Sequence, residues 1–263
     1  MNKPHPSHRK QPMPLNRSST ISEIDEICVF DAETTGIDRE NDRIVTFFIG
    51  TMTRDGVLTR SHSWLVNPGV PIPEGASAVH GITDEVAQSQ GVDPATAIRE
   101  MAETLGAYGY MPIVAFNGSY DLTILVRECR RHLGVQFTAD INAFVVIDPF
   151  IIDKGNDKYR RGKRTLAAVS EHHGVELVGA HDAEADATAT GRVAHAVLSK
   201  LPSTMTIGAL HDLQVRWAAE QARSLTEYFT RLGTLTSPIP ESWPMHPFEL
   251  AQAEAAQAAE SAA

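Results

Sequence analysis

Four carboxylates and one histidine stand at the ends of apolar segments, in a pattern suited to metal-assisted chemistry. Asp31 and Glu33 close an apolar run, and because side chains alternate along a strand they share one face. Asp121 follows a second run, and Asp186 comes five residues after His181. Carboxylates brought together need a counter-charge. Two divalent ions about 3.5–4 Å apart would supply it and would support in-line displacement at phosphorus.

Each of these residues also has an ordinary structural explanation. The first two acids could be solvated in a loop, Asp121 could favour a helix N-terminus, and His181 is one of 11 histidines. On one continuous helix His181 and Asp186 would lie about 140° apart, so they converge only if His181 precedes the helix, as Gly179 favours. The metal interpretation therefore depends on all three segments meeting at strand ends, where ligands of open α/β sheets gather.

The elements that would bring these segments together follow from hydrophobic periodicity. Apolar runs rich in β-branched and aromatic residues predict strands over 26–31, 42–50, 57–66, 113–116 and 144–148. Asp55-Gly56 predicts a hairpin turn, so the first three strands run antiparallel. Spacings of three and four predict helices over 93–105, 122–133, 165–173, 184–200 and 206–232. A meander followed by alternating helices and strands indicates an α/β fold with a mixed sheet.

The ordered motifs resemble those of the DEDDh family of 3′–5′ exonucleases, which includes the proofreading epsilon subunit of bacterial replicative polymerases, ribonuclease T and oligoribonuclease. The resemblance covers about residues 24–200. It rests on Asp31-x-Glu33-Thr-Thr-Gly, Asn117-x-x-Tyr120-Asp121 and His181-x4-Asp186, with secondary matches at Asp42–Val45, Val79–Thr83 and Val146–Asp148. Tyr120 stands where phenylalanine is frequent. The resemblance implies a ribonuclease H-like fold, in which a mixed five-stranded sheet is flanked by helices.

The resemblance also implies a mechanism. Asp31, Glu33, Asp121 and Asp186 would hold two Mg²⁺ or Mn²⁺ ions, which lower the pKa of a bound water and neutralise the scissile phosphate. His181 would take the proton of that water. The product would be a 5′-nucleoside monophosphate released from the 3′ end.

Substrate-binding residues are expected around this centre. Glu33 and Thr34 would lie near the terminal 3′-hydroxyl, and Asn117 and Tyr120 near the last nucleotides. His80 is a further candidate beside the substrate. A basic cluster over residues 153–164 offers Arg160 and Lys163 for phosphate contact and Tyr159 for stacking. The alternative for this cluster is a solvated loop that aids solubility.

Composition limits the class of protein. The chain has 263 residues, 42% of them hydrophobic, and a net charge of −10, which argues against a generic, basic nucleic-acid coat protein. No apolar run approaches the roughly 20 residues of a membrane span, and no signal-peptide pattern begins the sequence. Cys28 and Cys129 are interpreted as buried thiols in a reducing compartment. A cytoplasmic protein without a membrane partner is expected.

Four regions are expected along the chain. Residues 1–22 would form a disordered arm, 23–202 the exonuclease domain, 203–249 a helical extension with a proline-rich strap, and 250–263 an alanine-rich tail. The long helix of the extension could contact a DNA polymerase or a second copy of the chain.

The leading hypothesis is a metal-dependent 3′–5′ exonuclease that acts on single-stranded or frayed 3′ ends of DNA, in proofreading or repair. An exoribonuclease that trims RNA or short oligoribonucleotides is the alternative within nucleases. A catalytically idle subunit that binds nucleic acid or a polymerase is the alternative from another class, although the complete set of acids argues against it. No GxxxxGK[ST] segment supports a P-loop ATPase.

Overall fold

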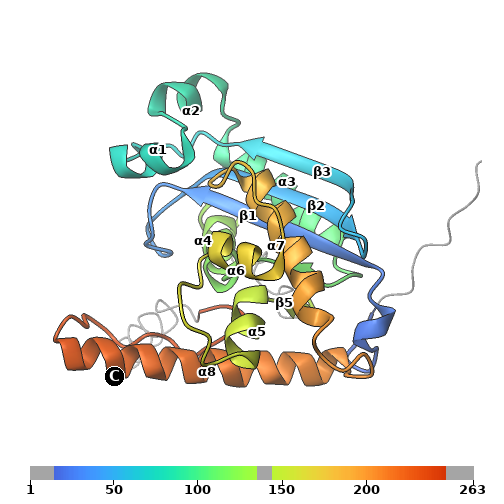
Figure 1. Ribbon diagram of the computed structural model, residues 1–263. Helices are drawn as coiled ribbons and strands as arrows, with labels where there is room; N and C mark the ends of the chain where they lie inside the picture. The colour runs from blue at the N-terminus through green and yellow to red at the C-terminus, as the bar shows by residue number, and fades with distance from the viewer. Residues whose placement is uncertain (1–14, 135–143, 247–263) are drawn as a thin grey trace, which may run out of the picture.

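A mixed five-stranded sheet lies at the centre of the computed structural model, which describes residues 15–134 and 144–246. The strand order is β3-β2-β1-β4-β5 (Figure 1). The first two pairings are antiparallel and the last two are parallel. The strands are β1 (Glu26–Thr34), β2 (Ile44–Thr53), β3 (Leu58–Leu65), β4 (Ile113–Val114) and β5 (Val146–Ile147). The mixed sheet that the motifs implied is therefore confirmed.

Strand β1 divides the core into two layers because its side chains alternate between the faces of the sheet. Cys28 and Phe30 pack in one layer, and Ile27 and Val29 pack in the other. The predicted turn at Asp55-Gly56 is present, with the Gly56 amide donating to the Thr53 carbonyl at 2.9 Å. Since β1 continues the alternation, Asp31 and Glu33 lie on the same face as Val29.

Helices cover both faces of the sheet. Helices α3 (Pro94–Ala107) and α4 (Ser119–Leu133) pack on the Phe30 layer, and α7 (Ala183–Leu198) packs on the Val29 layer with α6 (Leu166–His173) against it. Gly191 of α7 permits a close approach to the sheet, since a Cβ there would lie 2.7 Å from Val29 Cγ1. Helix α7 therefore crosses β1 on the side that carries Asp31 and Glu33 (Figure 1).

Three short helices of the structure were not predicted from the sequence. They are α1 (Glu74–His80), α2 (Asp84–Gln90) and α5 (Pro149–Asn156). At seven or eight residues each, they present too few turns to establish an apolar stripe. Local capping defines two of them instead: Thr83 accepts a hydrogen bond from the Val86 amide, and Asp148 accepts one from the Phe150 amide.

The last helix of the described chain, α8 (Ile207–Leu232), packs against α5, and its start lies beside the N-terminal segment of the described chain (Figure 1). Residues 15–22 belong to the expected disordered arm, yet they contact the start of α8. The Ile207 amide donates to the Ser19 carbonyl at 2.8 Å, and Arg17 pairs with Asp212 at 2.7 Å. The rest of the arm and the alanine-rich tail lie outside the described residues.

Two further expectations concern cysteines and membranes. Cys28 and Cys129 are both free and buried, as expected, and burial raises the pKa of the Cys129 thiol to about 12. Among the helices of the described ranges, none combines the length and apolar character that a bilayer crossing requires.

Candidate active site

Asp31 and Glu33 lie at the C-terminal end of β1, where the strand leaves its regular pairing with β2. The register shifts between Glu33 and Thr34, directly after the second carboxylate. Both acids face α7, and both are partly exposed. The end of this central strand thus presents two carboxylates on one face, as the sequence predicted.

Asp121 reaches the site from the first turn of α4 and is 4% exposed. A tight turn precedes it, in which Asn117 adopts a left-handed backbone with φ 56°. The Asp148 carboxylate at the end of β5 accepts hydrogen bonds from the amides of Asn117 at 3.0 Å and Gly118 at 3.1 Å. Asp148 therefore fixes the turn that aims Asp121. In the sequence Asp148 stands only within a secondary motif, and no local pattern there indicates this role.

His181 and Asp186 come together as the sequence analysis required. Helix α7 begins at Ala183 and is capped by Asp182, which accepts from the Ala185 amide. His181 precedes the helix with φ 70°, and this left-handed residue turns the chain so that its own amide donates to Asp186 Oδ2 at 3.2 Å. Ligand atoms of Glu33, His181 and Asp186 all lie within 4.8 Å of one another.

The charges of the neighbouring acids contribute to raised pKa values at Asp31 and Glu33. Burial, followed by the charges of Asp186 and Asp121, raises the pKa of Glu33 to about 8. Burial first, and then Asp121, Asp186 and Glu33, raise the pKa of Asp31 well above its ordinary value. Burial also raises the pKa of Asp121 to about 7 and raises that of Asp186. The cluster repels itself when ionised.

This donor set fits divalent cations. Carboxylate oxygens are the ligands that Mg²⁺ and Mn²⁺ prefer. Asp186 Oδ1 is buried without a hydrogen-bond partner among the described residues, so it retains an unused acceptor. A cation bound by Asp31, Glu33, Asp121 and Asp186 would relieve both the repulsion and the unpaired oxygen.

The hydroxyl groups of Tyr120 and Thr34, two of the expected substrate-binding residues, form a small hydrogen-bonded cluster beside the acids. Their hydroxyl oxygens lie 2.9 Å apart, and each lies 2.6 Å from the Gly36 carbonyl. The hydroxyl of Tyr120, which a phenylalanine would lack, thereby ties the start of α4 to the turn after β1. Because Tyr120 precedes Asp121 and Thr34 follows Glu33, these contacts fix the positions of the two acids relative to each other.

His80 reaches the same turn from the end of α1. Its Nδ1 accepts from the Ile82 amide at 3.1 Å. Burial lowers the pKa of His80, and an interaction with the Thr34 backbone opposes that shift. His80 is therefore placed against Thr34, among the residues expected to meet the substrate.

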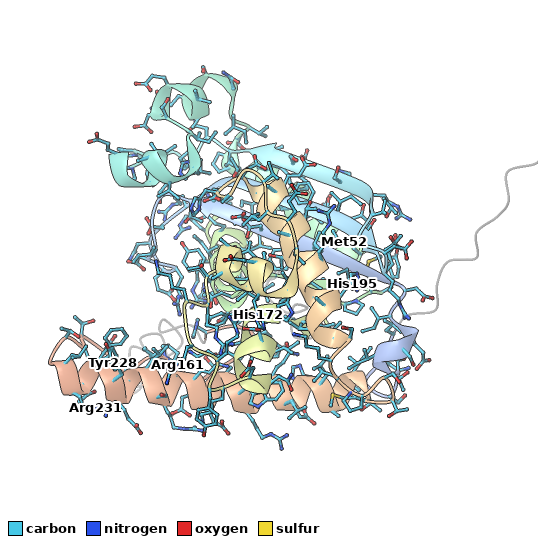
Figure 2. All side chains as sticks on the ribbon, in the orientation of Figure 1. Met52, Arg161, His172, His195, Tyr228 and Arg231 are labelled. Carbon is cyan, nitrogen blue, oxygen red and sulfur yellow. The ribbon has the colours of Figure 1, made fainter. Side chains whose placement is uncertain are left out.

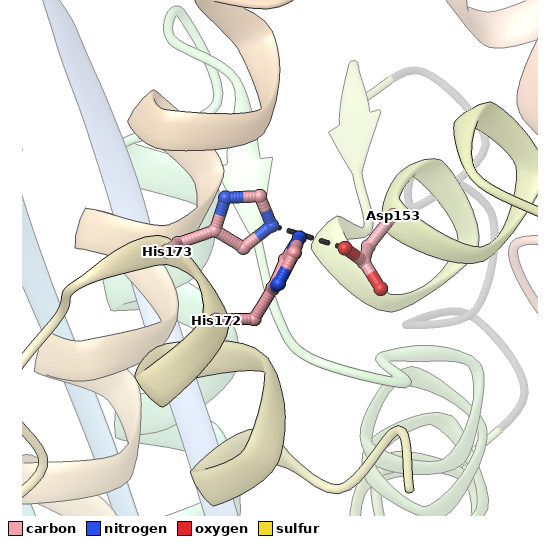
Figure 3. A group of neighbouring side chains, drawn as sticks. All are labelled: Asp153, His172 and His173. Carbon is pink, nitrogen blue, oxygen red and sulfur yellow. Dashed lines mark hydrogen bonds and ion pairs between the residues drawn. The ribbon is translucent and has the colours of Figure 1, made fainter. Parts of the chain in front are cut away.

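In the basic segment that connects α5 and α6, some side chains bond to residues in the interior and others are exposed to solvent. Arg160 and Arg164 both donate to Asp153 Oδ2, at 2.5 and 2.6 Å, and His173 Nε2 lies 3.0 Å from Oδ1. Figure 3 shows Asp153 with His173 and the neighbouring His172. Arg160, expected to contact phosphate, is thus bonded internally, whereas Lys163 and Tyr159 are exposed.

The Asp153–His172–His173 group also has metal-ligand spacing. Its carboxylate is already neutralised by two guanidinium groups, so it needs no cation. Burial alone would raise the pKa of Asp153, but hydrogen bonds from His173, Arg160 and Arg164 outweigh it and leave that pKa lowered. We interpret the group as the anchor of the basic connection (Figure 2 labels Arg161 and His172 around it).

Comparison with known proteins agrees with this geometry. The chain is 26% identical over 186 residues to the DNA polymerase III subunit epsilon of Aquifex aeolicus, covering 71% of this chain and 87% of the relative. It is 27% identical over 191 residues to the PolC-type DNA polymerase III of Clostridium perfringens, covering 72% of this chain but only 12% of that protein.

Solved structures show the same fold. Exonuclease I of E. coli in complex with a dA16 oligonucleotide superposes with a TM-score of 0.60 at 19% identity, covering 69% of this chain and 42% of that chain. The exonuclease I of Methylocaldum szegediense gives a TM-score of 0.59 at 20% identity, covering 76% and 45%. The family model described as Exonuclease, of the RNase T type, matches residues 28–194, and the chain belongs to this exonuclease family.

Proposed function

We propose that this protein is a divalent-metal-dependent 3′–5′ exonuclease that hydrolyses DNA from its 3′ end and releases 5′-nucleoside monophosphates. The observation that carries the proposal is the convergence of Asp31, Glu33, Asp121 and Asp186 with His181 at the end of β1. The raised pKa values, and an Asp186 oxygen that has no hydrogen-bond partner among the described residues, suit a bound cation. An idle subunit would gain nothing from this repulsion.

The acids would hold two Mg²⁺ or Mn²⁺ ions, which when bound would activate water and neutralise charge on the scissile phosphate. His181 is the candidate general base. Its imidazole lies on an exposed loop, next to Asp186 and Glu33, where it can accept a proton from a water and pass it to solvent. Glu33 would contribute both as a ligand and as a neighbour of the terminal 3′-hydroxyl.

Substrate contacts are proposed for the hydrogen-bonded cluster of Thr34 and Tyr120 and for its neighbours. Thr34, Tyr120 and His80 surround the turn that follows Glu33, and Asn117 begins the turn before Asp121. Lys163 would meet phosphates farther along the strand. Arg160 would support that contact indirectly, because it fixes the basic connection to Asp153.

DNA is favoured as the substrate because the relatives are named as a PolC-type DNA polymerase III and a DNA polymerase III subunit epsilon, and exonuclease I has been solved with DNA oligonucleotides. Single-stranded or frayed 3′ ends are the proposed form. A DNA polymerase or a second copy of the chain, bound through α8, is the proposed protein partner. RNA trimming is the alternative that a matched assay separates.

The test is digestion of 5′-labelled single-stranded DNA, duplex DNA and RNA of one sequence with Mg²⁺, Mn²⁺ or chelator. We expect stepwise shortening from the 3′ end of DNA, dependent on metal and lost in Asp31→Asn. Asp55→Asn, at the exposed tip of the β2–β3 turn, is the matched control and should retain activity. Unchanged digestion by Asp31→Asn would refute the metal site, and faster digestion of RNA would favour the alternative.

A further inference from the structure

An open cavity of about 850 Å³ lies between the segment that follows the first motif and the end of α8. Residues 37–40, which directly follow Gly36 at the end of the first motif, form one wall. The end of α8 and the strap that follows it form the other, through Phe229, residues 234–240 and His246. Figure 2 labels Tyr228 and Arg231 at this end of α8, which extends past the sheet.

The strap is attached to the helix that carries Asp121. His246 Nε2 lies 2.9 Å from Ser119 Oγ, and the His246 amide donates to Thr123 Oγ1 at 3.1 Å. The Ile239 amide donates to Thr226 Oγ1 of α8 at 3.1 Å. These bonds close the far wall of the cavity against α4 and fix its position relative to the site.

Arg39 is the available cation of this cavity. It is half-buried, and it makes no hydrogen bond or ion pair within residues 15–134 and 144–246. Burial lowers its pKa, opposed by Tyr120 and Glu40. Glu40 is itself engaged, because Arg127 donates to both of its carboxylate oxygens at 2.6 Å. A half-buried guanidinium that makes no hydrogen bond or ion pair in the described part of the chain is suited to bind an anion such as a phosphate.

The cavity also offers apolar surface. Ile37 is 92% exposed on the near wall and Phe229 is 36% exposed on the far wall, and Pro238, Ile239 and Pro240 continue the lining. Aromatic and apolar side chains provide stacking surfaces for bases regardless of sequence. A volume near the upper end of the range for small-ligand pockets, about 1,000 Å³, leaves room for more than one nucleotide.

From these observations we infer that the cavity binds the nucleotides of a single DNA strand on the 5′ side of the scissile bond, with a phosphate on Arg39 and bases against Ile37 and Phe229. This inference rests on the proposed function. It makes the C-terminal extension part of the substrate groove, although that extension lies outside residues 28–194 of the family match. The chain continuity between residues 33–36 and 37–40 favours the substrate strand over a protein segment as the occupant.

The test compares Arg39→Gln and Phe229→Ala with Arg99→Gln, an exposed arginine of α3 outside the cavity lining. Two hydrolysis substrates are used: a single-stranded dT ten-mer and the p-nitrophenyl ester of thymidine 5′-monophosphate, which cannot reach the cavity. We expect the ratio of kcat/KM for the ten-mer to kcat/KM for the ester to fall about tenfold in each cavity variant. The control should keep the wild-type ratio.

Binding of a 5′-fluorescein dT ten-mer in Ca²⁺ is measured separately by anisotropy, so that the cavity is tested even if hydrolysis fails. Arg39→Gln should reduce the slope of log K against log salt by about 0.7, the value for one phosphate contact on a single strand. Wild-type ratios and salt slopes in both variants would overturn the inference, as would an equal loss on ten-mer and ester. Wild-type protein that binds the ten-mer but cleaves neither substrate would refute the proposed function and leave the cavity assignment standing.

Discussion

Gln214 in the first half of α8 hydrogen-bonds the backbone of Asp148, with its Oε1 accepting from the Asp148 amide at 2.7 Å. Its Nε2 donates to the Val146 carbonyl at 3.1 Å. One amide side chain therefore occupies the free edge of β5, as a further strand would. Since the Asp148 carboxylate holds the turn before Asp121, α8 is connected to the carboxylate site through two residues.

Replacing Gln214 with leucine should destabilise the fold. Gln214 is fully buried, so its loss leaves the Asp148 amide and the Val146 carbonyl unpaired in an apolar environment. We expect the free energy of unfolding to fall by about 1–3 kcal/mol. Urea denaturation measures it, with Gln88→Leu on the exposed face of α2 as the control. Equal stability of the Gln214 variant would show that the two bonds contribute nothing net.

The sequence predicted the parts of this fold that periodicity encodes. The three antiparallel strands, the helices at 165–173 and 206–232 and the separation of His181 from its helix all follow from local patterns. Gln214 could not be found in this way, because a polar residue on an otherwise apolar helix face carries no sign of the strand edge it will meet.

The internal role of Arg160 was hidden for a related reason. A cluster of basic residues predicts a phosphate-binding surface. Only the packing of α5 against α6 shows that two of the arginines turn inward and form ion pairs with Asp153. The residues of the cavity walls are similarly remote in sequence: Arg39 and Phe229 line one cavity only because the strap folds back onto α4.

Without metal, the protein should lose stability as the pH rises from 7 to 8.5. A carboxyl whose pKa is raised in the folded state binds its proton more tightly there than in the unfolded chain. The stabilisation that this proton gives the folded state is present at low pH and is lost by the time the pH passes the folded-state pKa of the carboxyl. The loss runs from the unfolded-state pKa up to the folded-state pKa, so Asp121 at about 7 and Glu33 at about 8 bring it to completion within this window. Histidines with lowered pKa values, such as His246 at about 4, titrate below it.

Thermal denaturation in EDTA and in Mg²⁺ measures this dependence. We expect the Tm to fall across the window in EDTA and to fall less in Mg²⁺, because a bound cation stabilises the ionised acids. Glu33→Gln should flatten the upper part of the EDTA curve. A Tm in EDTA that rises with pH over this range would contradict the shared anionic site.

Replacing His181 with glycine should remove the general base while preserving the backbone. Glycine adopts φ 70° without the steric cost that other residues meet there, so metal binding by the acids should survive. We expect kcat to fall by about 10²–10⁴-fold, with the Mg²⁺-induced rise in Tm retained. Added imidazole should restore part of the activity of this variant. A wild-type kcat would exclude His181 from proton transfer.

Asp153→Asn should release the basic connection between α5 and α6. The Asp153 side chain is 3% exposed, and its arginine partners are 13% and 12% exposed. Removing the carboxylate charge leaves two largely buried guanidinium groups without compensation. Breaking such a buried pair costs about 3–5 kcal/mol, and we expect a loss of at least about 3 kcal/mol in urea denaturation.

Hydrogen exchange should localise this loss to residues 157–164, since Arg164 also donates to the carbonyls of Asp157 and Arg160. Asp157→Asn provides a control, because among the described residues its exposed side chain forms no hydrogen bond or ion pair with the arginines of this group. If the connection instead binds a metal through Asp153, His172 and His173, Zn²⁺ would raise the Tm of the wild-type protein and not that of Asp153→Asn. Because the two arginines already neutralise the carboxylate, we expect equal Tm values with and without Zn²⁺ in both proteins.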